Sequence, residues 1–79
     1  MQPTFRAMKA RELLRLLERA PLSYQVVRQT GSHRRLQASG RPPLTFAFHD
    51  AQELPPGLVR KILKRDVGLA DDEIVALLN

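Results

Sequence analysis

Cysteine is absent from this chain of 79 residues. Its absence excludes a disulfide framework, a thiolate metal site and a cysteine nucleophile, and nothing else in the composition indicates an oxidising compartment. Only two histidines are present, His33 and His49, and their spacing does not match that of a zinc site. We therefore expect neither a metal nor a cofactor, and we expect a cytoplasmic location.

Long apolar runs are missing as well. No stretch approaches the roughly 20 apolar residues that a membrane-spanning helix needs. The opening residues 1–6 also lack the apolar region of a signal peptide. We therefore expect no membrane partner and no processing. The length suits one small domain, residues 1–79, whose thin core a partner could stabilise substantially.

The chain carries an excess of positive charge. Lysine and arginine number 13 against 8 acidic residues, which gives a net charge of +5. Such a balance fits a phosphate backbone, because lysine and arginine gain affinity by releasing condensed counterions. Many small basic domains bind proteins instead, so the charge alone leaves both kinds of partner open.

Helical patterns occupy both ends of the sequence. A helix is predicted over residues 8–20, because its apolar residues recur at helical intervals, and Pro21 ends it. A second helix is predicted after Pro56, with an apolar stripe and with Gly68 as its C-terminal cap. A short third helix follows from Asp71, because acidic residues in a first turn complement the helix dipole.

Between the first two helices the sequence predicts three strands, over residues 24–29, 33–38 and 44–48. Gly31 and Ser32 form the first turn, and a loop over residues 39–43, rich in glycine and proline, separates the last two strands. Phe46 and Phe48 fall on one strand face and are expected in the core. Connections this short favour an antiparallel meander with helices on one face, which is an α+β domain.

The residues best suited to chemistry lie together in the segment Gly31–Arg35, where a turn delivers one histidine and two arginines to the start of a strand. RNA carries its own nucleophile in the 2′-hydroxyl, so a ribonuclease needs only a base, an acid and positive charge around the phosphate. Histidine titrates near neutral pH, and arginine binds phosphate through paired hydrogen bonds. From the residues alone, an ordinary surface histidine is the commoner alternative.

Three motifs in the same order resemble the HicA toxin family: Met8–Leu14 its first helix, Val27–His33 its signature strand and turn, and Leu54–Lys64 its second helix with the lead-in. The resemblance covers residues 8–69. Residues 1–7 are then an N-terminal extension, and residues 70–79 are an additional short helix.

The resemblance implies a fold like that of double-stranded RNA-binding domains, and metal-independent cleavage of messenger RNA. It implies that His33 is catalytic, that Gly31 shapes the turn presenting it, and that Ser32 helps to position phosphate. It also implies a HicB-like antitoxin that covers the histidine. The residues expected to bind RNA are Ser32, Arg28, Arg34, Arg35 and Arg41.

The sequence departs from the family pattern at two positions. Arg34 stands where many relatives carry a second histidine, which leaves the proton-transfer partner of His33 unidentified, and Leu36 stands where many carry an aromatic residue. Two alternatives stay open. A catalytically silent RNA-binding module would bind without forming product, and a protein-interaction subunit of a toxin–antitoxin complex would show little RNA affinity. His49 is expected to hydrogen-bond the loop before the second helix rather than to act in catalysis.

Overall fold

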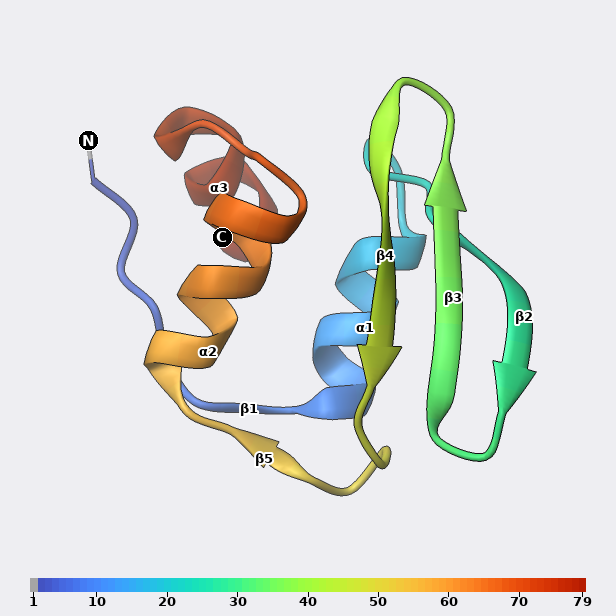
Figure 1. Cartoon of the computed structure of the whole chain (residues 1–79). Coiled ribbons are helices and arrows are strands. Elements are labelled where there is room, and N and C mark those ends of the chain that lie inside the picture. Colours follow the sequence, from blue (N-terminus) through green and yellow to red (C-terminus); the bar gives the residue numbers. More distant parts are fainter. Residues whose placement is uncertain (1) are drawn as a thin grey trace.

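The computed structural model describes residues 2–79 and has a three-stranded sheet with the helices gathered on one side of it (Figure 1). In chain order the elements are β1 (Met8–Lys9), α1 (Ala10–Glu18), β2 (Gln25–Thr30), β3 (His33–Ala38), β4 (Arg41–Ala47), β5 (Glu53–Leu54), α2 (Pro56–Lys61), the π-helical turn η1 (Ile62–Asp66) and α3 (Asp71–Leu78). The predicted α+β class and the order of its main elements are confirmed.

The first helix is shorter than the sequence predicts. It begins at Ala10, because Met8 and Lys9 form the strand β1, in which Met8 pairs with Leu54 and Lys9 with Glu53 of β5. The helix ends at Glu18, two residues before the predicted end. Its apolar residues are all buried, as their spacing indicates: Ala10, Leu13, Leu14 and Leu17.

The three longer strands form an antiparallel meander in the order β2, β3, β4. The central strand β3 has the predicted bounds, and β2 is displaced by one residue. Each strand is joined to the next by a turn of two residues, because Thr30 pairs with His33 and Ala38 with Arg41. The sheet is therefore compact, and β2 and β4 are its two edges.

The predicted loop over residues 39–43 is wrong in extent. Only Ser39 and Gly40 form the turn, and β4 already begins at Arg41 and includes Pro42 and Pro43. A proline cannot donate a ladder hydrogen bond, but an edge strand tolerates it. The hydroxyl of the buried Tyr24 donates to the Pro42 carbonyl at 2.7 Å. This hydrogen bond also anchors the start of β4 to the segment that precedes β2.

The core lies between the helices and one face of the sheet. Leu36, Leu44 and Phe46 provide the buried part of the sheet face. Phe48 is half-buried and packs edge-on against Phe46, with ring centroids 5.1 Å apart at an interplanar angle of 78°. The prediction that both phenylalanines belong to the core is confirmed. Among the described residues 2–79, no helix covers the opposite face of the sheet (Figure 1).

The C-terminal helices follow the predicted pattern with one local change. The last turn of the second helix widens, because the Val67 N–H donates to the Ile62 carbonyl five residues earlier at 2.9 Å. Gly68 then adopts a φ of +81°, and Leu69 N–H closes the end on the Leu63 carbonyl at 3.0 Å, which confirms the predicted cap. No helix within residues 2–79 is long and apolar enough to cross a membrane.

Candidate functional site

The open face of the sheet presents the outward-facing residues of its central strand. Successive side chains of a strand point to opposite faces. Leu36 of β3 is fully buried against the helices, so Arg34 shares its inward face while His33, Arg35 and Gln37 share the outward one. The segment that the sequence singled out is therefore divided between the two faces.

His33 is the first residue of β3, and its side chain is exposed. It lies between Thr30 of β2 and Ala47 of β4, its partners in the sheet register. The turn before it requires a left-handed residue, which Gly31 supplies with a φ of +59°. Gln29 Nε2 also donates to the Gly31 carbonyl at 3.0 Å. A short, braced turn therefore presents the histidine at one end of the open face.

Two arginines lie side by side next to this histidine. Arg28 of β2 is paired with Arg35 of β3, and Arg35 is paired in turn with Thr45 of β4. Arg35 Nη1 donates to Thr45 Oγ1 at 3.1 Å, which fixes one guanidinium over the sheet. Like charges directly opposite each other on a sheet are destabilising, so this arrangement favours an anion that would bind between them.

A hollow of about 290 Å³ unites these groups. Its lining within the described chain contains no carboxylate and consists of Arg28, Thr30, His33, Arg34, Arg35 and Thr45. The site therefore combines one imidazole, positive charge and hydroxyl groups, which suits a phosphate group next to a reacting proton.

Arg34 differs from its neighbours because its guanidinium is engaged within the protein. Arg34 Nη2 lies 2.7 Å from Asp50 Oδ1, in the turn after β4. Its side chain is only 13% exposed, and its Nη1 is buried without a hydrogen-bond partner among residues 2–79. Arg34 contributes to the wall of the hollow while it ties the start of β3 to the loop beyond β4.

The structure does not bring every predicted RNA-binding residue to this hollow. Ser32 adjoins His33 in the turn and is half-buried. Arg41 is paired with Ala38, five residues along β3 from the histidine, or about 17 Å along the strand. Because the hairpins reverse the chain, Arg41 lies at the other end of the sheet.

Thr30 and Thr45 also line the hollow, although neither was predicted as a site residue. The alternation that predicts a buried Phe46 also places Thr45 on the open face, so a signal for it was present.

The interpretation of His49 needs a correction in detail. The loop before the second helix is bonded through the His49 main-chain carbonyl, which accepts from Gln52 N–H at 2.9 Å. Its imidazole has no such bond within the described chain, and the residue is exposed.

Within residues 2–79, no group of three or more histidine, aspartate or glutamate side chains could hold a metal ion. A family model described as the HicA toxin of bacterial toxin–antitoxin systems matches residues 10–69. No curated protein and no solved structure matches the chain. The matched segment runs from the first residue of α1 to the residue after Gly68, so it includes the whole sheet and the hollow around His33.

Proposed function

This chain belongs to the HicA toxin family, and we propose that it acts by cutting messenger RNA with His33. Family membership makes it the toxin of a toxin–antitoxin system. The observation that best supports cleavage is the hollow in which an exposed His33 adjoins Arg28 and Arg35 with no carboxylate in the lining. A metal-independent ribonuclease needs these groups, because its nucleophile belongs to the substrate.

In the proposed reaction the neutral imidazole of His33 takes the proton of a 2′-hydroxyl. The 2′-oxygen then attacks the adjacent phosphorus, and the bond from phosphorus to the 5′-oxygen of the next nucleotide breaks. The departing 5′-oxygen receives a proton, for which the imidazolium so formed is a source. The expected products are a 2′,3′-cyclic phosphate and a free 5′-hydroxyl, with no net gain or loss of water.

Arg28 and Arg35 are proposed to bind the non-bridging oxygens of the reacting phosphate. Charge develops on these oxygens during the attack, and guanidinium groups held in advance stabilise it without reorganising. The hydrogen bond from Arg35 Nη1 to Thr45 Oγ1 supports such preorganisation. Removal of one such donor is expected to lower kcat by about 100-fold.

The antitoxin partner is proposed to be a HicB-like protein that covers His33 in the cytoplasm. The open face supports this proposal, because none of the helices that the structure describes covers it and its hollow is basic (Figure 1). An acidic or polar surface on the antitoxin would complement that charge. Addition of a HicB-like antitoxin that binds this chain should stop cleavage at a molar ratio near the stoichiometry of the complex.

The decisive experiment is cleavage of a labelled messenger RNA in the presence of a chelator. Wild-type protein is compared with His33→Ala, and with His49→Ala as a control at the other exposed histidine. Circular dichroism verifies that all three are folded. We expect the wild type and His49→Ala to cut, and His33→Ala to bind RNA without cutting.

Three other outcomes would overturn the proposal. If the folded wild type binds RNA but forms no product under any of these conditions, the protein is a catalytically silent RNA-binding module. If wild type and His33→Ala cut equally, another residue carries the chemistry. Cleavage that the chelator abolishes would point to a metal-dependent reaction.

A further inference from the structure

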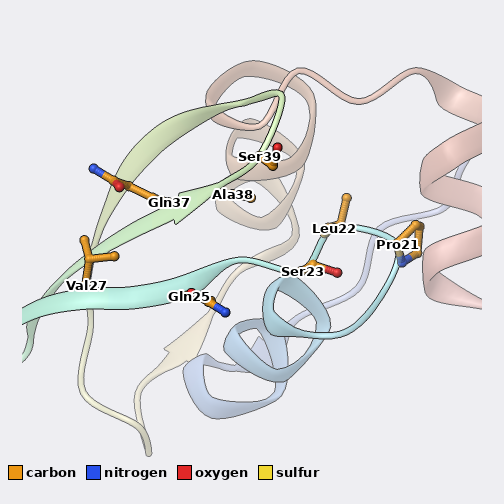
Figure 2. A pocket seen from close by; sticks show the side chains of 8 residues that line it. All are labelled: Pro21, Leu22, Ser23, Gln25, Val27, Gln37, Ala38 and Ser39. Atoms are coloured by element: carbon orange, nitrogen blue, oxygen red, sulfur yellow. The ribbon is translucent and has the colours of Figure 1, made fainter.

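A second, larger hollow lies on the same face of the sheet, at the end away from His33. Its volume is about 590 Å³, within the range of roughly 300–1,000 Å³ that is typical of small-molecule sites. Figure 2 shows that its lining comes from the loop after α1, from strands β2 and β3 and from the turn between β3 and β4. The lining residues are Pro21, Leu22, Ser23, Gln25, Val27, Gln37, Ala38 and Ser39.

The two hollows follow one another along the same pair of strands. His33, Arg35 and Gln37 alternate on the outward face of β3, and Gln37 is about 13 Å along the strand from His33. Gln25 of β2 is the partner of Gln37 in the register, just as Thr30 is the partner of His33. A ligand lying along these strands would therefore meet the basic hollow first and the second hollow next.

The chemistry of the second hollow differs from that of the first. Within the described chain none of its lining residues is charged. Gln25 and Gln37 are exposed, and their side-chain amides make no hydrogen bond to another described residue. Each free amide offers a donor and an acceptor in one plane. The hollow is therefore equipped for a polar, planar, uncharged group rather than for a phosphate.

Val27 adds an apolar surface between these amides and the basic hollow. A β-bulge shifts the register between Val26 and Arg28, and Val27 is left 51% exposed. An exposed side chain of this size on an otherwise polar face can contact the flat surface of an aromatic ring. The Pro21 ring lines the hollow at the loop after α1 (Figure 2).

We propose that this hollow binds an unpaired base of the RNA, a few nucleotides from the bond that His33 cleaves, and that adenine is the preferred base. The inference rests on the proposed ribonuclease function. A glutamine amide forms two hydrogen bonds to the N6 and N7 atoms of adenine, whereas phosphates carry no sequence information. The basic hollow would position the RNA backbone, and Gln25 or Gln37 would recognise the base.

The substrate in this proposal is single-stranded RNA. In an A-form duplex the major groove is too deep and narrow for side chains to read, and sequence-specific recognition targets unpaired bases. A base that enters the second hollow must therefore be unstacked. The toxin should cut unstructured regions with a preference at one position close to the cleaved bond.

The test uses short single-stranded RNAs that differ only in the base at each position around one cleavage site. For wild-type protein, kcat/KM is expected to be about tenfold higher when adenine occupies one particular position, the size of a good bidentate contact. In the double variant Gln25→Ala/Gln37→Ala this preference should disappear, so that kcat/KM is about the same for every base at that position. Gln52→Ala, an exposed glutamine in the loop after β4, is the matched control and should keep the preference.

A binding measurement separates failure of this proposal from failure of the ribonuclease proposal. The same RNAs are titrated against His33→Ala protein, with and without the two glutamine substitutions, by fluorescence anisotropy. Adenine-dependent affinity that disappears with the glutamines supports the base site even if the wild type never cuts. Equal affinity for all bases, or a preference that survives both substitutions, overturns it. If the two glutamine substitutions abolish binding of the antitoxin and leave the base preference unchanged, the hollow belongs to the antitoxin interface and the proposal is overturned.

Discussion

Arg34 and Asp50 form an ion pair, with Nη2 and Oδ1 2.7 Å apart, that joins the start of β3 to the turn after β4. The pair is asymmetric, because the Asp50 side chain is 57% exposed and that of Arg34 only 13%. Arg34 directly follows His33 in the chain. The ion pair therefore anchors the backbone that carries the proposed catalytic histidine.

Replacement of Asp50 by alanine should destabilise the protein by about 1–2 kcal/mol. The change leaves a largely buried guanidinium without its carboxylate, and the loss of a hydrogen bond to a charged group costs more than the loss of a neutral one. Urea unfolding of wild type and variant measures the difference. In an Arg34→Met background, where no buried charge remains, Asp50→Ala should cost much less. An equal cost in both backgrounds would show that the two residues are not coupled.

The two arginines on the open face should carry the salt dependence of RNA binding. Each guanidinium that neutralises a phosphate releases counterions, so Arg28→Ala and Arg35→Ala should each lower the slope of log affinity against log salt by about 0.7. The measurement uses single-stranded RNA and a His33→Ala background, so that the RNA stays intact. Arg65→Ala is the control, since this exposed arginine lies in η1 on the helix side of the sheet. An equal change of slope in all three variants would place the RNA elsewhere.

Local patterns predicted the parts of the fold whose cause is local. The helical spacing of the leucines in α1 and the alternation around Phe46 were sufficient to place both in the core. The bounds of His33–Ala38 also follow from nearby residues, since the turn at Gly31 and the turn at Gly40 limit this strand on both sides. These elements needed no information from distant parts of the chain.

Elements that depend on distant partners were not predictable in the same way. The pairing of Met8 with Leu54 joins two strands of two residues each, and neither has a repeating pattern. The wrong loop prediction at residues 39–43 has a similar cause. From the local sequence, Pro42 and Pro43 are expected to interrupt a strand, and only the position of β4 at the edge of the sheet makes them acceptable.

The candidate site was predicted in composition but not in geometry. The sequence identified His33 and its arginines, yet it could not show that Arg34 turns inward to Asp50 or that Arg41 lies at the far end of the sheet. Both facts depend on the register of the meander. The catalytic role of His33 and the RNA contacts stay predictions until cleavage and binding are measured.

Tyr24 should make the stability of the protein fall at alkaline pH. Its hydroxyl is buried and donates to the Pro42 carbonyl, and this burial raises the pKa of Tyr24 above its ordinary value near 10 despite the opposing charge of Arg41. The folded state therefore favours the neutral phenol. The contribution of Tyr24 is fully present below the unfolded pKa and is lost as the pH rises through the folded one.

The comparison of wild type with Tyr24→Phe isolates this effect. Near pH 7 the variant should be less stable by about 1 kcal/mol, because it lacks one hydrogen bond. Above pH 10 the difference should shrink as the wild-type phenol ionises during unfolding. Urea midpoints at pH 7, 9 and 11 measure it, and the titration of lysines cancels between the two proteins. A difference that stays constant to pH 11 would contradict the assignment.

Replacement by alanine of two glycines at opposite ends of the second helix should change the stability of the protein in opposite directions. Gly68 has a φ of +81° and caps the helix, and a Cβ added there would meet no atom within 4 Å. The cost of Gly68→Ala is therefore conformational, about 1 kcal/mol for an L residue in the left-handed region. Gly57 lies in the first turn of α2 with equally open space around its Cβ position and no positive φ.

Gly57→Ala should thus stabilise the protein by up to about 1 kcal/mol, because alanine loses less backbone entropy on folding and favours a helix. Thermal unfolding of the two variants beside the wild type measures both effects under one condition. Opposite shifts of the melting temperature are expected. A fall of equal size in both variants would mean that the added methyl groups, rather than the backbone angle at Gly68, decide the outcome.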